Sequence, residues 1–147
     1  MMEDEEILEN IGQHASHFVV LTGGEPSLFV DNHFVDLLHS HDYYVAIETN
    51  GTRLLPRTID WITLSPKIDV ENGNELMILE ADELKIVYHG QDLDGLANIS
   101  AKHRFIQPCD FNNADKNAKN LHLCIDYCKT HPEWKLSVQL HKLIGIK

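Results

Sequence analysis

Five short apolar segments, each ending at glycine, proline or charged residues, limit the folds open to this chain. They are HFVVLTGG (17–24), YYVAIETNG (43–51), WITLSPK (61–67), ELKIVYHG (83–90) and KHRFIQP (102–108). Their β-branched and aromatic content is typical of buried strands. Apolar residues at helical spacing fall in 5–16, 31–42 and 113–132, and 134–147 is predicted to be a terminal strand or an extended tail. Strands that alternate with helices indicate an α/β fold with mostly parallel strands.

The predicted functional site lies where these strands end. In open parallel sheets, ligands bind beyond the carboxyl ends of the strands. Those ends read TGGEP, ETNG, SPK, ELK and QPCD. Glycine lets a ligand lie against backbone N–H groups, and Glu25, Glu48, Lys67 and Lys85 add charge. Solvated turns explain any one of these segments, but five in the same position predict a ligand site.

Composition excludes several classes of protein. A length of 147 residues fits a single domain over 1–147. Twelve basic against 23 acidic side chains give a net charge of −11, which repels nucleic-acid phosphates. No apolar run approaches the roughly 20 residues of a membrane span. Three cysteines without a secretion signal suggest reduced thiols, so we expect a cytoplasmic protein.

The segment GGEP, from Gly23 to Pro26, carries a resemblance to a known superfamily. It resembles the motif with which radical S-adenosylmethionine (SAM) enzymes hold the amino group of their cofactor. With ETNG, SPK, QP and LSVQLHK following in that order, residues 5–147 resemble the 7-carboxy-7-deazaguanine synthase family of queuosine biosynthesis. The resemblance implies a partial (β/α) barrel of radical SAM type and a homodimer. It also implies a lyase that contracts 6-carboxy-5,6,7,8-tetrahydropterin to 7-carboxy-7-deazaguanine with loss of ammonia.

The same resemblance implies roles for individual residues. The carboxylate of Glu25 would accept a charge-assisted hydrogen bond from the cofactor ammonium, and Pro26 would fix the exit of the loop. Cofactor contacts are implied for Gly23, Gly24, Glu25, Glu48, Ser65, Pro66, Lys67, Gln107, Pro108, Cys109 and Asp110, with Cys109 contacting through its backbone. Substrate contacts are implied for Thr22 and for the terminal carboxylate of Lys147, with Asn50 near the cofactor and His141 near the mouth of the site.

One part of the family pattern is not found. Radical SAM enzymes hold a [4Fe–4S] cluster with three cysteines in a loop after the first strand, but residues 1–21 contain no cysteine. We therefore expect the chain to lack the first strand, the cluster loop and the Mg²⁺-binding threonine, and to be inactive by itself. Such a chain would leave the strand at 19–21 as an exposed edge.

The remaining cysteines and histidines give no metal assignment. Cys124 and Cys128 are four residues apart on a predicted helix, so they share a face and are compatible with a two-ligand site. They also lie on an apolar stripe with Leu121 and Ile125, which favours burial as small hydrophobic residues. Two histidine pairs without a third ligand nearby are predicted to be surface residues, His14 with His17 and His39 with His41.

Two alternative functions stay open. One is a shortened, non-catalytic protein that keeps a pocket for SAM or a nucleoside. The other is a fragment of a different radical SAM activating enzyme, against which the LSVQLHK tail argues. The DNA upstream of Met1 discriminates the first alternative from the synthase: an in-frame extension with three closely spaced cysteines supports the synthase, and a stop codon supports the shortened protein.

Overall fold

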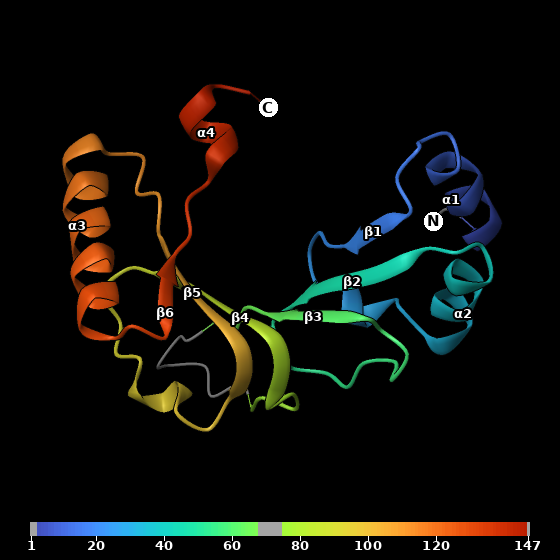
Figure 1. The fold of residues 1–147 in the computed structure, drawn as a ribbon, viewed down its shortest axis with the longest axis horizontal. Helices are drawn as coiled ribbons and strands as arrows, with labels where there is room; N and C mark the ends of the chain where they lie inside the picture. Colours follow the sequence, from blue (N-terminus) through green and yellow to red (C-terminus); the bar gives the residue numbers. More distant parts are fainter. Residues whose placement is uncertain (1–2, 68–74, 147) are drawn as a thin grey trace.

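Six parallel strands form one open sheet in the order β1-β2-β3-β4-β5-β6. The computed structural model describes residues 3–67 and 75–146. The strands are β1 (Phe18–Leu21), β2 (Tyr44–Thr49), β3 (Trp61–Leu64), β4 (Glu80–Tyr88), β5 (Ser100–Pro108) and β6 (Trp134–Leu136). The predicted α/β fold with parallel strands is confirmed. Over the described residues the sheet does not close, so β1 and β6 are its edges (Figure 1).

The helices are α1 (Asp4–Ile11), α2 (Asn32–Ser40), α3 (Ala114–Thr130) and α4 (Leu140–Ile144), with short 3₁₀ turns at Pro26–Leu28 and Asp94–Leu96. Asp31 caps α2 by accepting from the N–H of Phe34 at 2.9 Å, and Asn113 caps α3 by accepting from the N–H of Lys116 at 3.0 Å. None of the described helices is long and apolar enough to cross a membrane.

Two predicted elements differ from the structure. The first helix ends at Ile11, several residues before the predicted end at Ser16. The tail is a strand only over β6, after which α4 forms and ends at Gly145. Gly145 has φ of 69°, the left-handed conformation in which glycine commonly ends a helix. The alternating apolar and polar residues of the tail therefore predicted a strand where the structure has a short helix that ends at Gly145.

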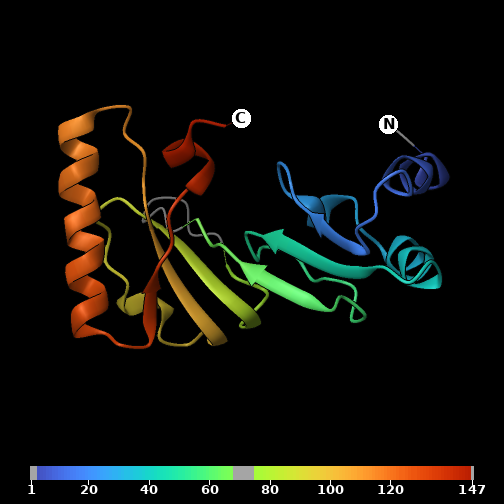
Figure 2. The same ribbon diagram turned by 45° about the horizontal axis from the view of Figure 1, so that its top comes forward.

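Alternating side chains give the sheet two unlike faces. One face packs under helices: Val45 lies in a cluster with Phe34 and Leu38 of α2, and Ile106 lies in a second cluster with Cys124 of α3. In both views α3 lies at one end of the molecule and α1 and α2 lie at the other (Figures 1 and 2). The core therefore lies between the helices and one face of the sheet.

The opposite face carries a mixture of aromatic and charged residues. Phe18 stacks on Tyr44 with ring centroids 5.4 Å apart, and Trp61 stacks on His103 at 5.9 Å. The exposed fraction of Phe18 is 54%, so this end of the face is open within the described residues. The parallel register continues the same face toward the carboxyl ends of the strands, where the candidate site lies.

Candidate functional site

A cavity of about 120 Å³ lies at the carboxyl ends of β1, β2 and β3. It is lined by Thr22, Gly23, Gly24, Glu25, Glu48, Thr49, Asn50, Ser65 and Lys67. Seven of these nine were expected to contact cofactor or substrate, and an eighth, Asn50, was expected nearby. The structure therefore brings together three strand ends, at Leu21, Thr49 and Leu64, that lie well apart in sequence.

The carboxylate of Glu25 is the most extensively hydrogen-bonded group in this cavity. Its Oε1 accepts from the backbone N–H of Ser27 at 3.2 Å and from the Ser27 hydroxyl at 2.6 Å. Two further donors come from the end of β2, the Thr49 hydroxyl to Oε1 at 2.6 Å and the Asn50 N–H to Oε2 at 2.8 Å. Burial alone would raise the pKa of Glu25, but these hydrogen bonds outweigh it and hold the pKa below its usual value. The site therefore presents an oriented, ionised carboxylate.

The glycines beside Glu25 leave the backbone accessible. A Cβ built on Gly23 or Gly24 meets no atom within 4 Å, so no internal packing requires glycine there. Gly23 has φ of 112°, which side chains rarely tolerate. Gly51, at the end of ETNG, differs: its Cβ would approach the Leu64 side chain closely, because Gly51 is buried against that residue. The first two glycines therefore suit ligand approach, whereas Gly51 serves packing.

The SPK segment follows β3 directly into the cavity. The Ser65 N–H donates to the carbonyl of Thr49 at 2.7 Å, which fastens the segment to the end of β2. Ser65 and Lys67 line the cavity, whereas Pro66 between them is buried. The expected role of Pro66 at the cofactor stays a prediction.

Glu48 lines this cavity and forms an ion pair with Lys85. The Nζ of Lys85 donates to its Oε1 at 2.7 Å. Lys85 was expected at a strand end, but β4 runs on to Tyr88, so Lys85 lies inside the strand. The run IVY (86–88), which continues the strand beyond Lys85, was the signal that indicated this.

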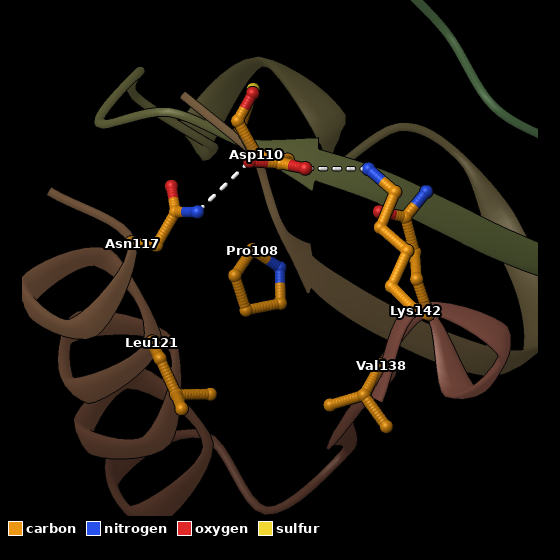
Figure 3. Close-up of a pocket in the computed structure, with 8 residues that line it drawn as sticks. Pro108, Asp110, Asn117, Leu121, Val138 and Lys142 are labelled. Atoms are coloured by element: carbon orange, nitrogen blue, oxygen red, sulfur yellow. Dashed lines mark hydrogen bonds and ion pairs between the residues drawn. The ribbon is translucent and has the colours of Figure 1, made fainter. Parts of the chain in front are cut away.

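The last three residues of QPCD lie at a different cavity, of about 250 Å³, between β5, α3 and the tail (Figure 3). It is lined by Pro108, Cys109, Asp110, Asn117, Leu121, Val138, Gln139 and Lys142. Gln107 is directed elsewhere and accepts a hydrogen bond from the Ser137 hydroxyl at 3.4 Å. The expected cofactor contacts are therefore divided between two cavities in this structure.

Asp110 is the charged centre of this second cavity. Its Oδ2 accepts from the Nζ of Lys142 at 2.6 Å, and its Oδ1 accepts from the Asn117 side chain at 2.9 Å (Figure 3). The hydrogen bond from Lys142, joined by those of Asn112 and Asn117, holds the pKa of Asp110 well below its usual range. Lys142 ties α4 to the end of β5, a contact that the sequence analysis did not identify.

The three cysteines occupy unlike positions. Cys124 is fully buried in the core, with Cys128 packed against the same cluster, so the apolar interpretation is confirmed. Burial, with the neighbouring Cys128 thiol, raises the pKa of Cys124 to about 11. Cys109 bonds through its backbone, its N–H donating to the Tyr88 carbonyl at 2.8 Å. These positions do not suit a thiolate-ligated cluster.

Among the described residues, no histidine lines the cavity at Glu25. His39 pairs with Asp60 at 2.9 Å, and His14, His17 and His41 are exposed. Over residues 3–67 and 75–146, no group of three His, Cys, Asp or Glu side chains is placed to hold a metal ion. His141 is exposed on α4, and Lys147 lies outside the described residues. The substrate role of Lys147 stays a prediction.

Thr49 is the residue of the first cavity that sequence analysis missed. It is buried and bonds Glu25 across 24 residues of sequence. Its place in ETNG was the available signal, since the segment had already been identified as a strand end. Which of its residues contacts Glu25 depends on the register of β1 and β2.

Comparison with known proteins places the chain in a family. No protein-family model matches it. It is 46% identical over 147 residues to a 7-carboxy-7-deazaguanine synthase from Bacteroides thetaiotaomicron, covering 100% of this chain and 75% of that protein. It is 42% identical over 134 residues to the synthase of Burkholderia multivorans, covering 90% of this chain and 60% of that one.

Structure comparison agrees with these relatives. A crystal structure of QueE from Escherichia coli matches with a TM-score of 0.74 and 31% identity, over 94% of this chain and 64% of that one. The chain thus spans between 60% and 75% of the proteins to which it is similar. On the extent of these matches, the chain belongs to the 7-carboxy-7-deazaguanine synthase family.

Proposed function

We propose that this chain is the cofactor-binding portion of a SAM-dependent radical lyase. Its substrate would be 6-carboxy-5,6,7,8-tetrahydropterin and its product 7-carboxy-7-deazaguanine, formed with loss of ammonia. The observation that carries the proposal is the carboxylate of Glu25, fixed by four hydrogen bonds beside exposed glycine backbone. Such an acceptor suits an ammonium group, because charge-assisted hydrogen bonds are short and strong.

The cavity residues fit SAM by their chemistry. Glu25 would accept from the amino group, while Gly23 and Gly24 would offer backbone to the methionyl part. Thr22, at the exposed rim, would contact the pterin. When bound, SAM supplies the radical. In this chain Glu25 would hold the ammonium of SAM, and the two glycines would leave room for its methionyl part. Thr49 and Asn50 orient the Glu25 carboxylate.

The residues of this chain do not fit the [4Fe–4S] cluster. Cys124 is buried among apolar side chains, and its pKa opposes formation of the thiolate that a cluster needs. Cys109 lies on a different element, at the end of β5. We therefore derive no step through the cluster or Mg²⁺, and propose that the chain by itself does not turn over.

A turnover comparison tests the proposal. The chain alone, and the same chain extended by the residues encoded in frame upstream of Met1, would be incubated anaerobically with reductant, SAM and the pterin. We expect 7-carboxy-7-deazaguanine from the extended protein alone. Binding of SAM by both without product from either would favour the non-catalytic alternative. Product from the unextended chain would contradict the proposed inactivity.

Self-association is proposed along the exposed edge. Among the described residues β1 pairs with one neighbouring strand only, and its side chains Phe18 and Val20 are 54% and 44% exposed. An unpaired edge with apolar side chains promotes association. This association would come in addition to the homodimer that the family resemblance implies. We propose a cytoplasmic homodimer, to be measured as molar mass by light scattering; a monomer at micromolar concentration would contradict it.

A further inference from the structure

A row of side chains crosses the open face of the sheet beside the cavity that Glu25 lines. The register pairs Glu48 of β2 with Thr63 of β3, and Thr63 with Glu83 of β4. Directly paired residues of neighbouring strands point to the same face. Glu48 and Glu83 are therefore separated by two strand spacings, roughly 10 Å between their Cα atoms, with only a short threonine side chain between them.

Lys85 reaches across this row. It lies two residues beyond Glu83 on β4, on the same face, and donates to Glu48 at 2.7 Å from the far side of β3. The Lys85 side chain is 19% exposed and that of Glu48 is 40% exposed. The Lys85 ammonium is thus the better buried partner of the pair. It can therefore hold the more exposed Glu48 carboxylate in place.

Glu83 is the second carboxylate near Lys85. Within the described residues the Glu83 side chain makes no hydrogen bond. Lys85 donates to Glu48 instead. The charged or titratable groups that influence it come from three strands, Lys85 on β4, Glu48 on β2 and His103 on β5. Burial raises the pKa of Glu83, Glu48 raises it further, and Lys85 and His103 oppose both. The pKa of Glu83 therefore depends on the positions of the Lys85 ammonium and the Glu48 carboxylate.

We propose that Lys85 is a positioning residue of the cofactor cavity, acting through Glu48. By holding the Glu48 carboxylate at the cavity wall, it fixes an acceptor that the bound cofactor meets. Without the ammonium, two carboxylates face each other across Thr63, and Glu48 turns toward solvent because its side chain is already partly exposed. This role rests on the proposed SAM site, but the placement of Glu48 is testable without it.

The placement of Glu48 is tested in this chain by titrating Glu83, with the side-chain carboxyl carbon of Glu83 monitored by NMR. Lys85→Met should raise the pKa of Glu83 above that of the wild type, since an opposing charge is removed. Glu48→Gln should lower it. Lys85→Arg should keep it near the wild-type value, and the control Lys102→Met should leave it unchanged, because Lys102 is an exposed lysine paired with Asp82.

Calorimetry with SAM then tests the consequence for binding. Lys85→Met should weaken affinity about tenfold, the scale of a lost charge-assisted hydrogen bond. The Lys85→Arg variant should recover most of that loss, and Lys102→Met should bind like the wild type. If wild type binds no SAM, the proposed function fails while the titration still decides the placement. An unchanged Glu83 titration in both Lys85→Met and Glu48→Gln, or affinity equal to that of Lys102→Met, would overturn the inference. If Lys85→Met does not fold, Glu48→Gln carries the decision, and an unchanged Glu83 titration in that variant would overturn the inference.

Discussion

Replacing Glu25 by glutamine separates the charge of the cavity carboxylate from its shape. The side chain keeps its size, but the ammonium of SAM would lose a charged acceptor. A hydrogen bond to a charged group contributes about 1.5–3 kcal/mol. The expected loss in SAM affinity is therefore roughly tenfold to a hundredfold. Isothermal calorimetry measures it directly, with Glu9→Gln on the exposed surface of α1 as a matched control.

The same substitution should also lower stability. Four donors face the Glu25 carboxylate, from Ser27, Thr49 and Asn50. The amide nitrogen of glutamine must turn toward one of them, so one hydrogen bond is lost and two donors oppose each other. We expect a loss of about 1–2 kcal/mol in the free energy of unfolding at pH 7, measured by urea denaturation.

The pH dependence of that loss has a definite sign. Because the pKa of Glu25 in the folded chain lies below its usual value of 4.5, its stabilisation is present above pH 4.5 and is lost as the pH falls through the lowered folded value. The stability difference between wild type and Glu25→Gln should therefore shrink in that acidic range. Equal SAM affinity in both proteins, or a stability difference that grows in acid, would refute the reasoning.

Three further predictions test packing, thiol chemistry and the cluster. Gly51→Ala should lower the free energy of unfolding by about 2 kcal/mol or more, because a positive φ and the contact with Leu64 both oppose a side chain; Gly24→Ala, with open space around it, should change it by less than about 0.5 kcal/mol. At pH 8 a thiol reagent should label Cys109 while Cys124 reacts only after urea unfolding, since Cys124 is buried; labelling of Cys124 in the native chain would contradict its core position. Anaerobic reconstitution of the unextended chain with iron and sulfide should give no stoichiometric cluster, and stable absorbance near ~400 nm with matching iron content would contradict that.

Local patterns in the sequence determined the fold class and the position of the principal site. Alternation of apolar strands with helical segments reports backbone conformation residue by residue, so five of the six strands were identifiable before any contact was known. Parallel strands direct their carboxyl ends to one edge of the sheet. TGGEP, ETNG and SPK could therefore be assigned to one site without knowledge of the register, and GGEP with the later motifs indicated the family.

Tertiary structure decided which of those residues act together. The hydroxyl of Thr49 reaches Glu25 only because β1 and β2 pair in one particular register. Lys85 meets Glu48 only because β2, β3 and β4 pair in the register that brings both side chains to one face. Strand spacing, rotamers and the course of each crossover set such contacts, and none of these leaves a local pattern in the sequence.

The tail and the QPCD segment show the same limit. The sequence placed Asp110 with the cofactor residues of β1 to β3, but the structure gives it a separate cavity with Lys142 of α4. That helix was hidden because five residues closed by Gly145 are too few for a helical period to stand out from an alternating one. Local periodicity fixed where strands end, whereas packing across the sheet fixed which strand ends share a cavity.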